Sequence, residues 1–193
     1  ATAFGRARVV ETCGGTASGL GYAADAELGV VDRGWLRGSR QSVVVERRTD
    51  APSTSEHVPP PADSDLHLTV VDSSWDLACL LGSPGWLGEL ARGSSPVILV
   101  ARATVPGLRR LAAAIELVGE ARAVAVTVGA RRWPRPVEHS AAAAVRRLRE
   151  AGRFVTVPEL QTLALSGLTP DALPPAILRP AGTLLNLLER PLS

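Results

Sequence analysis

The chain has 193 residues, 46% of them hydrophobic, a length close to that of one domain and a composition sufficient to bury a core. Its 21 Lys and Arg residues are all arginine, and the formal net charge of +2 is too small to indicate a nucleic-acid-binding protein by itself. The two cysteines, Cys13 and Cys79, exclude a secreted disulfide scaffold, and the lack of a basic leader or a long apolar segment favours a cytoplasmic protein that does not insert into a membrane.

The first strand is expected at residues 8–12, and a glycine-rich segment follows it. Gly14 and Gly19 stand at the G-x-x-x-x-G spacing of a phosphate-binding loop. Such a loop continues with Lys and then Ser or Thr, which contact the β/γ-phosphates and Mg²⁺, but here the two positions hold Leu20 and Gly21. The segment therefore predicts either a degenerate nucleotide loop or a simple glycine turn.

The next strands are expected at residues 42–46 and 67–72, on either side of a segment rich in proline and serine. That segment, residues 49–65, predicts an exposed loop that need not be ordered, inserted within one sheet. The strand at 67–72 is apolar and ends in Asp72, which is the form of a Walker B strand whose aspartate holds Mg²⁺ through water. An ordinary cap for the following turn is the alternative for Asp72.

The second half of the chain alternates strands and helices more regularly. Near-continuous apolar runs are typical of buried parallel strands, and they are followed by amphipathic or proline-initiated segments. Strands are expected at 96–101, 123–128 and 154–157, and helices at 106–118, 136–151 and about 171–189. The last of these is interrupted near Pro174, Pro175 and Pro180, which predicts two shorter helices. With right-handed crossovers, this order predicts one α/β domain over 1–193, three-layered and doubly wound around a mostly parallel sheet.

Arginines gather between residues 131 and 153, and Trp133 lies among them. The candidate contacts for nucleic-acid phosphates or other anions are Arg131, Arg132, Arg135, Arg146 and Arg149. On one continuous helix, Arg146, Arg149 and Arg153 would share a face. The first three candidates belong to a strand-to-helix loop at the edge of the sheet where doubly wound folds bind ligands. A solvated helix face is the alternative for the arginines of the helix.

From Leu68 onward, the chain resembles the ParA/MinD group of P-loop proteins, particularly its divergent actinobacterial members. The resemblance rests on residues 69–75, 96–104, 155–160 and 164–168, and it covers about two thirds of the chain. It implies a P-loop NTPase-like fold and non-specific DNA binding.

The chain departs from that family at the signature loop, which reads Lys, two glycines, any residue, glycine, Lys, then Ser/Thr. Aligned through Gly14 and Gly15, the chain has Cys13 and Ser18 at the two lysine positions. Neither this frame nor the one through Gly19 restores a cation. We therefore expect no ATP hydrolysis, no catalytic residue, no metal site and no ATP with Mg²⁺ as cofactor.

Three functions are compatible with these features. The first is a degenerate ParA/MinD-like pseudoenzyme, a homodimer that works as a scaffold or partner-binding protein. The second is a DNA-binding accessory factor that uses the arginine-rich face without sequence preference. The third is a weak nucleotide-binding ATPase whose missing cation is an arginine of another chain, Arg102 or Arg132.

Overall fold

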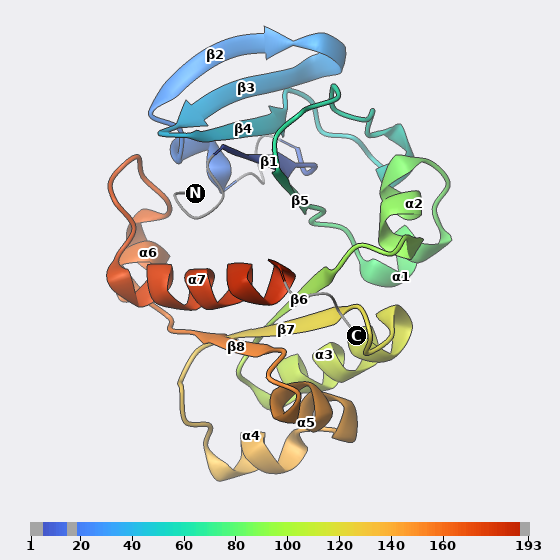
Figure 1. The fold of residues 1–193 in the computed structure, drawn as a ribbon, viewed down its shortest axis with the longest axis vertical. Coiled ribbons are helices and arrows are strands. Elements are labelled where there is room, and N and C mark those ends of the chain that lie inside the picture. The colour runs from blue at the N-terminus through green and yellow to red at the C-terminus, as the bar shows by residue number, and fades with distance from the viewer. Residues whose placement is uncertain (1–5, 15–18, 190–193) are drawn as a thin grey trace. The chain divides into compact units, whose positions relative to one another are not determined.

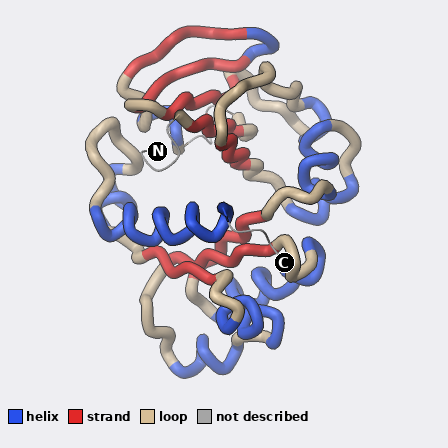
Figure 2. Tube along the Cα trace, in the orientation of Figure 1, coloured by secondary structure: helices blue, strands red, loops and turns tan. Residues whose placement is uncertain are grey.

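The computed structural model describes residues 6–14 and 19–189, which fold as an α/β protein (Figures 1 and 2). The chain divides into two compact units. The first contains Ala1–Leu90 and Thr162–Asp171, and the second contains Ala91–Gln161 and Ala172–Ser193. Among the described residues, no helix has the length and apolar character needed to cross a membrane.

The first unit is built on a mixed five-stranded sheet with the order β2-β3-β4-β1-β5. Its strands are β1 (Ala7–Glu11), β2 (Ala26–Val31), β3 (Trp35–Arg40), β4 (Val43–Arg48) and β5 (Leu68–Asp72). β1 lies between β4 and β5 and is parallel to both, whereas β2, β3 and β4 form an antiparallel meander. The strands expected at 8–12, 42–46 and 67–72 are therefore neighbours, and the 49–65 segment connects β4 to β5.

The hairpin of β2 and β3 was not predicted from the sequence. Its turn is the short helical segment η2 (Asp32–Gly34), in which Arg33 and Gly34 both have positive φ angles, 57° and 74°. β2 lies at the edge of the sheet and is exposed along most of its length, so it lacks the continuous apolar run by which the buried strands are recognised.

The remainder of the first unit consists of short helices and a long connection. Two short helical segments are η1 (Leu20–Tyr22) and η3 (Ser55–His57), and two α-helices are α1 (Leu77–Gly82) and α2 (Trp86–Arg92). The 49–65 segment contains no strand, yet Val58 within it is buried, and its carbonyl oxygen accepts a hydrogen bond from Trp86 Nε1 at 2.8 Å. The connection is therefore held against α2.

The second unit contains a parallel three-stranded sheet with the order β6-β7-β8. The strands are β6 (Val97–Arg102), β7 (Ala123–Val128) and β8 (Phe154–Val157), and the helices are α3 (Val105–Val118), α4 (Arg135–Ser140), α5 (Ala143–Glu150) and α7 (Pro175–Glu189). The remaining helix, α6 (Gln161–Ser166), belongs to the first unit except for its first residue. Figure 1 shows α7 on the other side of this sheet from α3, α4 and α5. The core of the unit lies between β7 and α3, where Val124, Leu108 and Ile115 are fully buried.

Two expectations about the helices are wrong. The helix expected at 136–151 is broken at Ala141 and Ala142, which both have extended backbones, so α4 and α5 are separate helices. Ala141 is buried at this break, and its carbonyl oxygen accepts a hydrogen bond from Arg146 Nη1, which offsets the lost helical bond. Conversely, the interruption expected near Pro180 does not occur, because α7 continues through it.

Candidate functional site

The glycine-rich segment and the acidic strand meet at one edge of the five-stranded sheet. Glu11 and Asp72 are the last residues of the neighbouring parallel strands β1 and β5, and they are paired in register. The next residue, Thr12, joins the two strands, since its backbone N–H donates to the Asp72 carbonyl oxygen at 3.0 Å and its hydroxyl donates to the Ser73 carbonyl oxygen at 2.7 Å. The structure thus brings the two predicted halves of a nucleotide site together.

The charge at this edge is the opposite of what a phosphate group needs. The side chain of Glu11 is buried, with 3% of the residue exposed, and its Oε1 atom accepts a hydrogen bond from the backbone N–H of Gly19 at 3.2 Å. In a phosphate-binding loop, backbone N–H groups of this kind point at the ligand. Here the chain's own carboxylate takes that position, and no sequence pattern had singled it out.

Cys13 is close to the carboxylates of Glu11 and Asp72, and it stands at the position that one alignment frame assigns to a lysine. Burial raises the pKa of its thiol, and the negative charge of Glu11 raises it further, against a smaller opposing effect of the hydrogen bond with Ser74. The charge of Asp72 acts in the same direction as that of Glu11. The thiol is therefore neutral at physiological pH, so Cys13 adds no charge beside the carboxylates of Glu11 and Asp72, and the cation nearest to Glu11 in the sheet register is Arg47 of β4.

Asp72 is exposed, and Ser74 donates a hydrogen bond from its hydroxyl to the carboxylate at 3.1 Å. Among the residues that the structure describes, no three His, Cys, Asp or Glu side chains are grouped as metal ligands. The Walker B role of Asp72 remains a prediction, and so does the simpler alternative of a turn cap, because the hydrogen bond from Ser74 comes from a side chain and not from a backbone N–H group.

The glycines of the segment differ in what they do. A Cβ atom added to Gly14 would lie 2.8 Å from the Cβ atom of Ala51, in the connection after β4, so the close approach of these two segments requires a glycine. A Cβ atom added to Gly19 would meet no atom within 4 Å, and its φ angle of −83° is ordinary. Gly15 lies outside the described residues. The sharpest requirement for glycine therefore comes from packing within the chain.

The predicted arginines of the second unit do not form one face. Arg146 caps α4 through the Ala141 carbonyl, and Arg149 pairs with Glu138 at 3.0 Å. Arg153 lies beyond the end of α5 and donates to the carbonyl oxygens of Glu120 and Ala121, so it cannot extend a helical stripe. Exposed positions are occupied by the three arginines of the loop and of the first turn of α4: Arg131, Arg132 and Arg135.

Two of the predicted arginines line a cavity of about 550 Å³ that extends along β8, from Phe154 to Pro158, and reaches Gly129 just after the carboxyl end of β7. Arg131 and Arg149 share this cavity with Arg179 of α7, which had not been predicted. The remaining lining residues are Val155, Thr156, Ala176, Pro180 and Thr183. None of the lining residues is acidic, so the cavity has the charge that suits an anion.

An aromatic pair supports the wall of this cavity. The guanidinium of Arg149 lies over the ring of Trp133, 5.0 Å from its centroid, and the Trp133 ring meets Phe154 edge-on at 5.6 Å. The guanidinium of Arg149 is therefore held both by stacking on the Trp133 indole and by its ion pair with Glu138. Arg179 and Thr183 are four residues apart on α7, so both lie on one helix face. This spacing is the only feature of the sequence that relates the two residues.

Arg102 is one of the two arginines considered as a cation for another chain's loop. It pairs with Glu159 at 3.0 Å, and both side chains are more than half exposed.

Comparison of the chain with models of known protein families, with curated protein sequences and with solved structures finds no match. The family and the activity therefore rest on the residues alone.

Proposed function

We propose that the protein is a degenerate ParA/MinD-like domain that does not hydrolyse ATP and acts as a scaffold that binds a protein partner. A three-layer, P-loop NTPase-like arrangement of the α/β fold is part of this proposal. The observation that carries it is the hydrogen bond from the Gly19 N–H to the buried carboxylate of Glu11. Phosphoryl transfer depends on positioning and on positive charge, and a single arginine supplies roughly 10³ to 10⁵ in rate, so an edge with two carboxylates and no lysine opposes the reaction.

The first experiment measures release of phosphate from ATP in the presence of Mg²⁺. We expect no turnover above that of a protein-free blank, for the native chain and for Asp72→Ala alike. A protein-dependent rate that Asp72→Ala abolishes would overturn the proposal and favour the third alternative, an ATPase that takes an arginine from another chain. In that case, Arg102→Gln and Arg132→Gln would identify the donor.

A partner-binding role is supported by apolar side chains on the first unit. Tyr22 of η1 is 79% exposed, and Leu28 and Val30 of the edge strand β2 are 58% and 68% exposed. Among the described residues, β2 has no strand on its outer side. A strand edge of this kind pairs with another strand, and two copies of one edge strand form a self-complementary antiparallel pair. The partner that we propose is therefore a second copy of the chain.

The oligomeric state tests this part of the proposal. Light scattering after size-exclusion chromatography should give the mass of a dimer at micromolar concentration, and the monomer mass for Val30→Asp. Leu117→Asp, which places the same charge at a 53% exposed leucine of α3, is the matched control and should remain dimeric. A monomer at all concentrations, or equal effects of the two variants, would contradict the role assigned to β2.

A second candidate function is non-specific DNA binding, and the observation that favours it is the cavity lined by Arg131, Arg149 and Arg179 without an acidic residue. Each phosphate neutralised by such an arginine contributes about −0.9 to the slope of log K against log salt concentration. Replacing Arg131 or Arg179 with Gln should therefore reduce the slope by about 1 each. Arg110→Gln, at an exposed position of α3, is the control. Absence of duplex binding at low salt would remove this candidate.

A further inference from the structure

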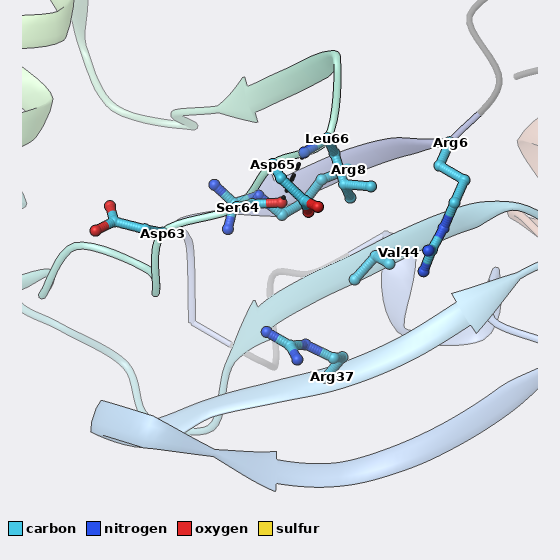
Figure 3. Close-up of a pocket in the computed structure, with 8 residues that line it drawn as sticks. All are labelled: Arg6, Arg8, Arg37, Val44, Asp63, Ser64, Asp65 and Leu66. Atoms are coloured by element: carbon cyan, nitrogen blue, oxygen red, sulfur yellow. Dashed lines mark hydrogen bonds between the residues drawn. The ribbon is translucent and has the colours of Figure 1, made fainter.

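A second group of arginines lies in the first unit, at residues that no motif had singled out. Arg6, Arg8 and Arg37 line a cavity of about 650 Å³ together with Val44 and the residues 63–66 (Figure 3). Arg8 and Val44 are paired near the starts of β1 and β4, and residues 63–66 precede β5. The cavity is therefore at the amino-terminal edge of the parallel strands, away from the glycine-rich segment that follows the carboxyl end of β1.

Arg8 is the buried member of the group, with 10% of its side chain exposed. Its Nε–H donates to Thr69 Oγ1 at 3.4 Å, and Nη1 donates to Glu46 Oε2 at 3.3 Å and to the Ala62 carbonyl oxygen at 2.6 Å. Three acceptors on three different segments fix the plane of the guanidinium. The remaining nitrogen, Nη2, has no acceptor among the described residues.

Glu46 is shared between two arginines. Its side chain is 1% exposed, and its Oε1 atom accepts hydrogen bonds from Arg37 Nε at 2.9 Å and from Arg37 Nη2 at 2.5 Å. Because one carboxylate faces two guanidiniums, the three side chains together carry one positive charge, and the 34% exposure of Arg37 leaves this charge accessible from solvent. The excess positive charge favours the approach of an anion.

The acidic residues of the cavity do not supply that partner. Neither Asp63 nor Asp65 forms an ion pair with the three arginines, and Figure 3 shows the carboxylate of Asp63 directed away from them. Arg6 is exposed and has no ion pair within the described part of the chain. Three guanidiniums thus border one cavity, and among the described residues Arg6 has no ion pair and Arg8 Nη2 has no acceptor.

We propose that this cavity binds a small molecule through an oxyanion group, a phosphate or a carboxylate. The planar fork of a guanidinium matches the oxygens of either group, and a guanidinium already held by other acceptors binds with little loss of side-chain freedom. The volume lies within the range of about 300–1,000 Å³ found for small-molecule sites. Val44 and Leu66 offer apolar contacts for the rest of the molecule. The site is independent of the function proposed for the glycine-rich segment.

The test is isothermal titration calorimetry of the full chain with inorganic phosphate and with succinate, at constant ionic strength. Saturable binding of at least one anion is expected, and the tighter of the two identifies the group as phosphate or carboxylate. Arg37→Gln should weaken binding by roughly tenfold, the weight of one charge-assisted hydrogen bond. Arg6→Gln should also weaken binding, and because Arg6 is exposed and unpaired among the described residues, this variant keeps the test valid if Arg37→Gln does not fold.

Two further variants distinguish binding at this cavity from a general attraction of anions to positive charge on the protein. Arg33→Gln removes an exposed arginine of the same unit that pairs with Asp32, and it should bind as the native chain does. Asp65→Asn removes a negative charge from the lining and should tighten binding. The proposal is overturned if neither anion binds saturably, if Arg6→Gln binds as the native chain does, or if Arg33→Gln weakens binding as much as Arg6→Gln.

Discussion

Replacing Glu11 with glutamine tests the electrostatic argument at the glycine-rich segment. The substitution keeps an oxygen acceptor for the Gly19 N–H but removes the charge. An anion bound at that N–H would take the place of Glu11 Oε1, which is now 3.2 Å from the nitrogen, and the displaced carboxylate would remain roughly 5 Å from the anion. At an effective dielectric constant of about 20, the repulsion is about 3 kcal/mol, and burial of Glu11 limits its screening by solvent.

This repulsion corresponds to about a hundredfold in affinity, so Glu11→Gln should bind ATP at least about tenfold more tightly than the native chain. The assay is a calorimetric titration with ATP, with and without Mg²⁺, after circular dichroism has shown that the variant is folded. Asp32→Asn is the matched control, because it removes the same charge from a side chain that is 75% exposed, and it should leave the affinity unchanged. If Glu11→Gln and the native chain bind ATP equally, the carboxylate does not govern this edge and the reasoning fails.

Three further predictions concern stability and reactivity. Gly14→Ala should lower the free energy of unfolding in urea by about 1–3 kcal/mol because its Cβ atom has no room, whereas Gly19→Ala should change it by less than about 0.5 kcal/mol; equal effects would contradict the packing argument. Glu46→Gln should cost about 3–5 kcal/mol because it leaves buried positive charge unpaired, and a native-like urea midpoint would show that the network is not formed. Because the pKa of its thiol is raised, Cys13 should react with iodoacetamide at pH 8 more slowly than the exposed Cys79. Mass spectrometry of the labelled protein measures the two rates. Faster labelling of Cys13 would contradict the effect assigned to burial and to the nearby carboxylates.

The strands with runs of apolar and β-branched residues were predictable. The runs at 8–12, 67–72 and 123–128 correspond to β1, β5 and β7 within about one residue, although β1 also buries Arg8 and Glu11 and β5 is partly exposed. β2 and β3 escaped prediction because β2 is an exposed edge strand and its turn depends on two positive φ angles, at Arg33 and Gly34. Local patterns carry little information about such a hairpin, which is defined by its pairing with β4.

The helix boundaries show the same limit. The stop of α3 was predictable, because Gly119 has a φ angle of 86° that favours glycine. The break between α4 and α5 was not, since it occurs within a run of alanines, where burial of Ala141 and the cap from Arg146 decide the backbone. Continuity of α7 through Pro180 likewise depends on tertiary context, which outweighs the propensity of proline.

The nucleotide site itself stays a prediction, but the neighbourhood of its two parts follows from the sheet. β1, which precedes the glycine-rich segment, and β5, which ends in Asp72, end at one edge because they are parallel and in register. The role of Glu11 was invisible, since a carboxylate at a strand end has no motif. Arg179 was missed for a similar reason: it comes from a distant helix and joins Arg131 and Arg149 only in the folded chain.

A crystal structure of the protein soaked with ATP and Mg²⁺ would show directly whether the glycine-rich segment holds a nucleotide. We expect no nucleotide after β1, with Glu11 still accepting the hydrogen bond from the Gly19 N–H. Density for β- and γ-phosphates on that N–H group, with Mg²⁺ held near Asp72, would contradict this expectation.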